Sequence, residues 1–511
     1  MPALTPLKGT ALIDAHLGQH HRRRREKNLM AVSGCLRIID THTLTAASRR
    51  SPAHVGISTE HVLPFPRSDV WQWHTRPGAV VRLTPPFVPM TPVKQASSLA
   101  TGTTEFSLPA GLKWVAKHDL AGYHEGRQFT DVCVNAPMRV LSQWRHVHAF
   151  ADDPAGTRIT DTVHTRLPGS FLEAAFAYRQ HQLLEDLTRI QEFQSIEGAP
   201  AQPLTIALTG SGGLVGTHLG AQLRTAGHTV IELKRGSDLA PGQRRWHTTL
   251  PDEDLLEGVD VLIHLAGESI AGRMSETHRE KIRHSRITPT RRLAELVAAS
   301  KTCTTMVVAS AVGFYGPDRG DELLDENAER GEGFLADVVA DWEDACAPAR
   351  EAGARVVNLR TGLVMSAAGG ILPGLRAAFA AGLAPQVGTE GGYLPWVSID
   401  DLTSMYIRAA LDPQMSGPFN ATGPAPVRSE EFSEALQGAM HRKFVVPIPA
   451  VAPKLVMGPI ASEELLMTSQ NAVPAKFEQL GHRFTHNLLP EAFAHELGGE
   501  ALLNTASTSE A

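Results

Sequence analysis

Three glycines at three-residue steps are the residues whose type and spacing best suit a specific chemistry. They are Gly210, Gly213 and Gly216, and they follow a short apolar run that begins at Leu204. In a strand–turn–helix unit the first glycine permits a tight turn, the second lets backbone approach a pyrophosphate, and the third lets the helix pack on the strand. The helix N-terminus then faces the phosphate charge. The predicted phosphate-binding residues are Thr209, Gly210, Gly213, Leu214, Val215 and Gly216.

The elements around these glycines match what dinucleotide binding requires. Residues 204–208 read as a buried strand, 218–226 as a helix and 229–233 as a second strand. A glycine triplet alone is a weak signal, but this flanking order is the context that gives it meaning. The alternative is a plain tight turn between a strand and a helix.

The residues after the second strand bear on which dinucleotide would bind. An NAD enzyme usually places an acid here to hold the ribose 2′-hydroxyl. This chain has Lys234 and Arg235 instead, and Glu232 lies inside the strand, where it is a poorer ribose ligand. Two cations favour a 2′-phosphate, so we expect NADP rather than NAD. The alternative is that both are ordinary surface charges.

Composition sets the broad class. A chain of 511 residues predicts about two to three domains. The net charge of −6 gives no indication of nucleic acid or an anionic membrane as a partner. Four scattered cysteines favour a reducing cytoplasm, and no run of about 20 apolar residues predicts a membrane span.

The first segment, residues 1–55, carries a basic run at 20–25 and little apolar periodicity. We expect a solvated, disordered tail, with an interaction tail as the alternative. No apolar core follows the charges, so it does not resemble a secretory signal, and either Met1 or Met30 is a candidate start.

Residues 56–193 predict a separate α+β unit. Several runs alternate apolar with polar residues, as in a half-buried antiparallel sheet, and residues 171–193 read as a long closing helix. This order is that of a helix-grip domain. Residues 194–203 then form a short linker with one glycine and two prolines.

Two histidines in this unit suggest metal binding at first sight. His146 and His148 lie at i and i+2, so on a strand both point the same way. We find no nearby cysteine or carboxylate pattern that completes a ligand set, so we assign no metal ligand and expect hydrogen-bonded sheet histidines.

The same unit has motifs of a known family. It resembles the START/cyclase-like (SRPBCC) domains that precede some epimerase-like proteins, and the resemblance implies a small hydrophobic ligand. The matching segments are Arg76-Pro77-Gly78, Arg82-Leu-Thr-Pro-Pro86, Phe129-x-Asp131 and Trp144-x-His146-x-His148-x-Phe150.

From residue 204 the pattern alternates strand and helix, which predicts an α/β fold with a Rossmann-type doubly wound parallel sheet. Residues 204–497, including a small lobe at about 415–497, resemble the epimerase-like branch of the extended short-chain dehydrogenase/reductase superfamily. Its members are labelled NAD-dependent epimerase/dehydratase or "cell division inhibitor-like", and residues 498–511 read as a tail. The matching segments are Thr209-Gly-x-x-Gly-x-x-Gly216, Leu265-Ala-Gly-Glu268, Ser285-Arg-Ile287, Ser310-Ala-Val-Gly-Phe-Tyr-Gly316, Arg360-Thr-Gly362 and Trp396-Val-x-Ile-Asp-Asp-Leu402.

This resemblance implies a set of cofactor contacts. The pyrophosphate is expected on residues 210–216 and the 2′-phosphate near the cations after the second strand. The further residues expected around the dinucleotide are Leu265, Ala266 and Gly267 near the adenosine, Arg286 near the ribose phosphate and Leu363 near the nicotinamide.

Catalysis is where the chain departs from the family pattern. The superfamily uses a Tyr-x-x-x-Lys pair, and the matching positions here hold Leu335 and Val339, neither of which can exchange a proton. Ser310 and Tyr315 are the remaining catalytic candidates, with Glu268 and Tyr393 as others. Tyr315 also suits a packed aromatic at a strand end.

Three functions remain open. The first is NADP-linked redox or epimerisation of a small molecule. The second is a catalytically degenerate NADP(H)-binding sensor coupled to a hydrophobic ligand in the first unit. The third is a structural or regulatory partner in division. Asp400 and Asp401 are expected to cap a helix over 402–411 rather than to act in chemistry.

Overall fold

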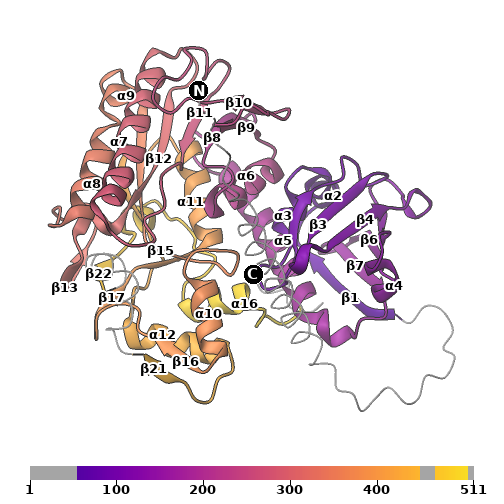
Figure 1. Cartoon of the computed structure of the whole chain (residues 1–511). Helices are drawn as coiled ribbons and strands as arrows, with labels where there is room; N and C mark the ends of the chain where they lie inside the picture. The colour runs from indigo at the N-terminus through magenta and orange to yellow at the C-terminus, as the bar shows by residue number, and fades with distance from the viewer. Residues whose placement is uncertain (1–54, 449–466, 504–511) are drawn as a thin grey trace, which may run out of the picture.

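The computed structural model describes residues 55–448 and 467–503 (Figure 1). The expected tails therefore fall outside the described residues, apart from Val55 and residues 498–503. Within the described part, the chain forms two seven-stranded sheets, one antiparallel and one parallel, along with four two-stranded pairs. Figure 1 shows the two larger units side by side, with α3, α5 and α6 between their sheets.

The first unit is an antiparallel sheet in the order β1-β7-β6-β5-β4-β3-β2. Residues in β6 and β7 alternate between buried and partly exposed, so one face is covered, as the sequence pattern predicts. The long helix α5 contributes Leu183 and Leu187 to the core under that face. The strands are β1 (Val55–Leu63), β2 (Thr91–Lys94), β3 (Thr103–Ser107), β4 (Lys113–His118), β5 (Gln128–Cys133), β6 (Arg145–Asp153) and β7 (Gly156–His164), and the helices are α2 (Arg67–Thr75), α3 (Ala79–Arg82), α4 (Met138–Ser142) and α5 (Glu173–Gln194).

The second unit confirms the predicted α/β class with a Rossmann-type parallel sheet. Its strand order is β10-β9-β8-β11-β12-β14-β19, which reverses direction beside β8, the strand before the glycine loop. The strands are β8 (Thr205–Thr209), β9 (Thr229–Lys234), β10 (Gln243–Arg245), β11 (Val261–His264), β12 (Thr305–Ala311), β14 (Arg355–Thr361) and β19 (Gly417–Ala421).

Helices cover both faces of this sheet. Alternate strand residues point into two separate cores, one shared with α6 and α11 and the other with α7, α8 and α9. Two helices, α8 and α9, follow β12 instead of one continuous helix, and Pro348 lies in the first turn of α9, where its missing N–H is tolerated. The helices are α6 (Leu214–Ala226), α7 (Glu276–Ala299), α8 (Phe334–Asp344), α9 (Ala347–Glu351) and α11 (Ile399–Leu411).

A smaller lobe lies beyond the carboxyl ends of the parallel strands. Its core contains Phe379, Trp396, Phe432 and Phe493. The elements are β13 (Asp318–Leu324), β15 (Leu363–Met365), α10 (Leu372–Ala380), β16 (Leu383–Pro385), β17 (Tyr393–Leu394), β18 (Trp396–Ser398), β20 (Val427–Arg428), α12 (Ser429–Ala439), β21 (Val446–Ile448), β22 (Ser469–Ala472) and α16 (Leu489–Leu497). The short helix α15 (Ala475–Gln479) instead contributes Phe477 to the core of the parallel sheet.

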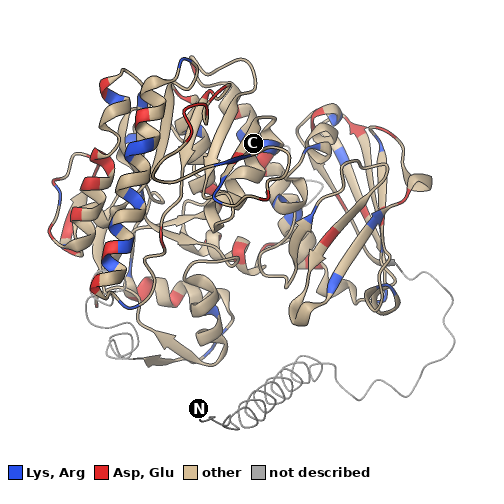
Figure 2. Cartoon of the chain, turned by 45° about the horizontal axis from the view of Figure 1, so that its top comes forward, with Lys and Arg blue, Asp and Glu red and all other residues tan. Residues whose placement is uncertain are grey.

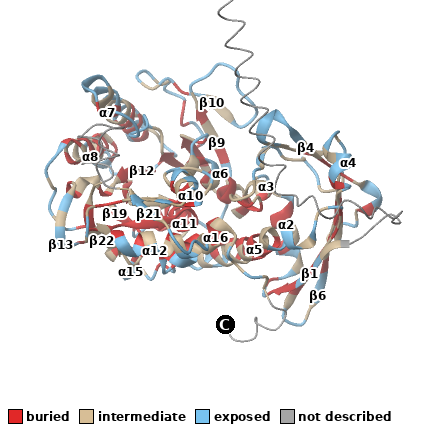
Figure 3. Cartoon of the chain, turned by 60° about the horizontal axis from the view of Figure 1, so that its bottom comes forward, coloured by how far each residue is buried: buried red, intermediate tan, exposed pale blue. Residues whose placement is uncertain are grey.

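The two larger units meet through buried charges. Arg82 of α3 forms ion pairs with Asp186 of α5 and with Asp400 of α11, each at 2.6 Å. Helix α11 is buried along nearly its whole length (Figure 3). Its N-terminus is capped by Ser398, whose hydroxyl accepts from the backbone N–H of Asp401 at 3.0 Å. The expectation that Asp400 and Asp401 cap this helix is therefore wrong.

Surface charge is mixed. Figure 2 shows Lys and Arg interspersed with Asp and Glu over both units. Among the described residues, no helix combines the length and apolar character that a bilayer crossing needs.

Candidate dinucleotide site

The glycine loop joins β8 to α6 with no room for side chains at its ends. Gly210 has a φ of 70°, in the left-handed region that favours glycine. A Cβ on Gly216 would lie only 2.2 Å from the carbonyl oxygen of Gly210. The first and third glycines are therefore required by backbone geometry, which matches the predicted turn and helix-packing roles.

Thr209 links the glycine loop to the segment that follows β11. Its side chain is fully buried, and its Oγ1 accepts hydrogen bonds from the backbone N–H groups of Leu265 at 3.0 Å and Ala266 at 3.2 Å. This ties the end of β8 to the segment after β11. Thr209 therefore positions the two walls of the site and does not face a ligand.

A cavity of about 1470 Å³ opens over this edge of the sheet. It exceeds the roughly 300–1,000 Å³ that pockets for drug-sized ligands measure, which leaves room for a larger ligand such as a dinucleotide. Seven of the thirteen predicted cofactor residues line it: Gly210, Gly213, Lys234, Arg235, Leu265, Ala266 and Gly267. The other six are Thr209, Leu214, Val215, Gly216, Arg286 and Leu363, and they lie outside that lining.

The cations at the end of β9 have different surroundings. Lys234 Nζ lies 3.1 Å from Glu232 Oε2, whereas Arg235 is exposed at the cavity edge. Glu232 also pairs with Arg224 at 2.7 Å. Although burial opposes it, these two cations lower the pKa of Glu232 below its ordinary value. The Glu232 carboxylate is thus already neutralised by two cations.

Arg286 supports the loop after β11. Its guanidinium donates to the carbonyl oxygen of Glu268 at 3.0 Å and lies 5.1 Å from the ring centre of Trp342. A Cβ on Gly267 would sit 3.2 Å from that guanidinium. Burial lowers the pKa of Arg286 to about 10. The side chain lies behind Gly267, within reach of the cavity wall.

Ser310 lies at the carboxyl end of β12 in a charged network. Its hydroxyl donates to Glu343 Oε1 at 2.6 Å, and Arg360 pairs with both oxygens of Glu343 at 2.9 Å. Ser310 and Arg360 are buried. The network gives the serine a fixed orientation at the edge where substrates of this fold bind.

Tyr315 is fully buried. Its hydroxyl lies 2.7 Å from Asn420 Oδ1, 2.9 Å from the carbonyl oxygen of Asp325 and 3.1 Å from Arg360. Burial raises its pKa, although Arg360 opposes the shift. These contacts fit the packed-aromatic alternative, and a catalytic role for Tyr315 stays a prediction.

The two positions that replace the family's tyrosine and lysine face the loop after β12. A Cβ on Gly313 would lie 3.6 Å from Leu335 Cβ and 4.0 Å from Val339 Cγ2. Of the other candidates, Glu268 lines the cavity, and Tyr393 accepts a hydrogen bond from Arg428 at 2.9 Å within the small lobe.

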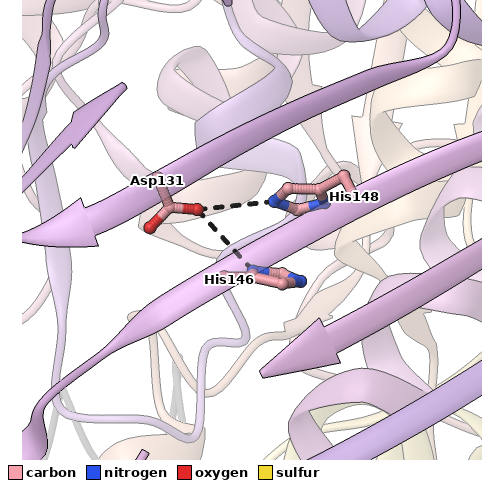
Figure 4. A group of neighbouring side chains, drawn as sticks. All are labelled: Asp131, His146 and His148. Carbon is pink, nitrogen blue, oxygen red and sulfur yellow. Dashed lines mark ion pairs between the residues drawn. The ribbon is translucent and has the colours of Figure 1, made fainter. Parts of the chain in front are cut away.

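The first unit brings His146 and His148 together with carboxylates that their sequence spacing does not indicate. His146 and His148 do have nearby carboxylates: Asp131 from β5 and Asp161 from β7, on either side of β6 (Figure 4 shows Asp131). The expectation that no carboxylate completes the pair is wrong. Each acid lies on a neighbouring strand, so its proximity depends on sheet register and not on sequence spacing.

Comparison with known proteins agrees with the observed fold. A model of the NAD dependent epimerase/dehydratase family matches residues 206–421, and a domain of unknown function, DUF1731, matches residues 448–496. An epimerase family protein of Mycobacterium bovis is 40% identical over 293 residues, which are 57% of this chain and 96% of that protein.

Two solved structures extend the comparison. A nucleoside-diphosphate sugar epimerase from Corynebacterium glutamicum is 50% identical, with a TM-score of 0.78 over 89% of this chain and 92% of that one. The match with this relative therefore spans both larger units of this chain. The human epimerase family protein SDR39U1, solved with NADPH, shares the fold over 57% of this chain and 99% of its own, with 24% identity and a TM-score of 0.52. Together with the glycine loop, the parallel sheet and the cavity above it, these relationships show that the chain belongs to the NAD-dependent epimerase/dehydratase family.

Proposed function

We propose that this protein binds NADP(H) in the cavity above β8, β9 and β11 and uses it in oxidoreduction or epimerisation of a small molecule in the cytoplasm. Membership of the family supports a nicotinamide dinucleotide. The C. glutamicum relative, named a nucleoside-diphosphate sugar epimerase, suggests nucleotide sugars as the first substrates to test.

The observation that carries the cofactor proposal is the charge arrangement at the end of β9. Lys234 and Arg235 line the cavity, and Glu232 is occupied by Arg224 and Lys234. A ribose 2′-hydroxyl would find the Glu232 carboxylate already paired, whereas a 2′-phosphate would meet two cations. The phosphates of the dinucleotide would rest on the glycine loop at the N-terminus of α6.

Calorimetric titration of Lys234→Ala/Arg235→Ala with NADPH and NADH tests this arrangement. Loss of two charge-assisted contacts to the 2′-phosphate should weaken NADPH binding by about 100-fold or more and leave NADH nearly unchanged. Arg292→Ala is the matched control, because Arg292 is an exposed α7 residue paired with Glu295. Equal losses for both nucleotides, or loss in the control as well, would contradict the proposed 2′-phosphate site.

For chemistry we propose that Ser310 turns its single O–H from Glu343 to the substrate oxygen when substrate binds, with Glu343 and Arg360 as positioning residues. Ser310 lies at the carboxyl end of β12, and Leu363 begins β15 just beyond the adjoining strand β14. Ser310→Ala should lower kcat about 10-fold or more without weakening NADPH binding. Unchanged turnover in Ser310→Ala together with lost turnover in Tyr315→Phe would transfer the role to Tyr315.

The alternative function is a binding or sensing protein without catalysis, and two observations favour it. Leu335 and Val339 replace the family's proton-exchanging pair. The first unit also packs directly on α6, since a Cβ on Gly78 would lie 2.6 Å from the carbonyl oxygen of Ala221. A ligand in the first unit would therefore act on the helix that begins in the dinucleotide loop. Tight NADPH binding with no turnover of any substrate would favour this alternative.

The START-like identity of the first unit is part of the same proposal. Its antiparallel sheet and closing helix α5 support a helix-grip domain with a ligand under the sheet. Thr59 Oγ1 and both ring nitrogens of His61 are buried there without a hydrogen-bond partner among the described residues. We therefore propose a ligand that is largely apolar and carries at least one polar group.

A further inference from the structure

Three potential ligand atoms converge on the inner face of the first sheet. Asp131 of β5 lies opposite His146 of β6 in the ladder, and His148 lies two residues further along on the same face. Asp131 Oδ2 is 3.7 Å from His146 Nδ1 and 3.5 Å from His148 Nε2 (Figure 4). One ligand atom from each residue falls within 4.8 Å of the others.

Asp161 fixes which nitrogens face this point. Its Oδ1 lies 2.8 Å from His146 Nε2 and 2.9 Å from His148 Nδ1. A carboxylate only accepts hydrogen bonds, so each of these nitrogens carries a proton. In a neutral imidazole the other nitrogen then presents a lone pair. Both lone pairs face Asp131 Oδ2, so three electron-pair donors meet with no proton among them.

The distances suit a bound cation. Zinc binds imidazole nitrogen and carboxylate oxygen at about 2.0–2.2 Å, which places neighbouring ligands of a tetrahedral site about 3.4 Å apart. The observed separations of 3.5 and 3.7 Å are close to that spacing. They are long for direct hydrogen bonds, which have donor–acceptor distances of about 2.7–3.2 Å.

The surroundings resemble the outer shell of a metal centre. Metal-binding histidines commonly donate their second N–H to a carboxylate, and here Asp161 Oδ1 accepts from His146 Nε2 at 2.8 Å and lies 2.9 Å from His148 Nδ1. The second oxygen of Asp131 accepts a hydrogen bond from Trp144 Nε1 at 3.1 Å, which fixes that carboxylate too. Phe129 stacks on His148 with ring centres 4.0 Å apart, and both histidines are buried. The ligand set is thus rigid and largely shielded from water.

We propose that Asp131, His146 and His148 bind one divalent transition-metal ion of the zinc or iron(II) class, with Asp161 as a positioning residue. Two imidazoles and one carboxylate are the donors that zinc and non-haem iron(II) accept, and three protein ligands leave a position open. The site lies in the first unit, outside the cavity proposed for the dinucleotide, and does not depend on that proposal.

The competing explanation is a shared proton. Burial opposes the charge, but the two aspartates raise the pKa of His148. A doubly protonated His148 would therefore also relieve the repulsion between its Nε2 lone pair and Asp131 Oδ2. A proton would leave the cluster with no affinity for metal. The two explanations therefore predict different metal contents: one ion per chain for a metal site, and none for a shared proton.

The test uses the full-length protein, purified without chelator and analysed for metal content by mass spectrometry. Chelator-treated protein is then titrated with Zn²⁺, with Co²⁺ as a spectroscopic probe and with Fe²⁺ under anaerobic conditions. We expect one ion per chain, and d–d absorption bands for bound Co²⁺. The metal content distinguishes zinc from iron.

Variants locate the site. His146→Ala/His148→Ala and the more conservative Asp131→Asn should each abolish or strongly weaken binding, whereas Asp161→Asn should weaken it about 10–100-fold. His164→Gln is the matched control, because His164 lies in β7 on the opposite face from Asp161 and should bind as wild type does. Wild-type protein that binds none of the three ions, or binding that survives in the double variant, would overturn the proposal. Circular dichroism of the metal-free variants shows that each is folded.

Discussion

Replacement of Arg82 by methionine should strongly destabilise the whole chain. The Arg82 guanidinium lies 2.6 Å from Asp186 Oδ1 and 2.6 Å from Asp400 Oδ1, and its Nε donates to Asp186 Oδ2 at 3.0 Å. The three side chains are 1%, 2% and 7% exposed, and they come from α3, α5 and α11. This one cation therefore connects two helices of the first unit to the second unit.

The magnitude follows from what the substitution leaves behind. Methionine fills a similar volume but leaves two buried carboxylates without their cation. Although burial opposes it, Arg82 and His495 hold the pKa of Asp400 well below its usual range, so that carboxylate is charged in the folded protein. Breaking a buried ion pair from one side costs about 3–5 kcal/mol, and we expect a loss of that size in the free energy of unfolding.

The assay is urea unfolding followed by far-ultraviolet circular dichroism. Arg82→Met should lower the unfolding midpoint, and Arg82→Met/Asp186→Asn/Asp400→Asn should recover most of the loss, because it removes the unpaired charges as well. Arg292→Ala, at an exposed ion pair, should change stability by less than about 1 kcal/mol. An Arg82→Met protein within about 1 kcal/mol of wild type would refute the reasoning.

Two further predictions concern the loop and pH. Gly216→Ala should lower dinucleotide affinity at least 10-fold in calorimetry, because the new Cβ would lie 2.2 Å from the carbonyl oxygen of Gly210. Unchanged affinity would show that the loop relaxes around the Cβ and would contradict this prediction. Although burial opposes this shift, nearby carboxylates, Glu500 foremost, raise the pKa of His495 from 6.5 to about 9. The contribution of His495 to stability is therefore complete below pH 6.5 and is lost as pH rises through 9. Urea midpoints measured from pH 6 to pH 10 should fall over that window, and His495→Gln should flatten the fall; an equal fall in the variant would exclude His495 as the cause.

The parallel sheet was predictable because its signals are local. Apolar runs, glycine turns and helical periodicity all lie within a few residues of each other, and the glycine segment from Thr209 to Gly216 fixes strand, turn and helix together. The break between α8 and α9 has a weaker signature in the sequence. Pro348 is the one local signal that could have indicated it.

The contacts that depend on tertiary structure were not predictable in this way. Asp400 was expected to cap its own helix, yet its partner Arg82 lies 318 residues away in sequence. Asp131 and Asp161 reach the two histidines through the register of three antiparallel strands, and a shift of one residue would turn each side chain to the other face. No spacing rule in one sequence specifies that register.

The cavity over the glycine loop is the proposed binding site for NADP(H). The most direct test of this proposal is calorimetric titration of the full-length protein with NADPH, NADP⁺, NADH and NAD⁺ under identical conditions. The arrangement of Lys234 and Arg235 predicts tight binding of NADPH or NADP⁺ and weaker binding of the two nucleotides that lack the 2′-phosphate. Failure to bind any of the four would contradict the cofactor assignment, and preference for NADH or NAD⁺ would contradict the role of the two cations.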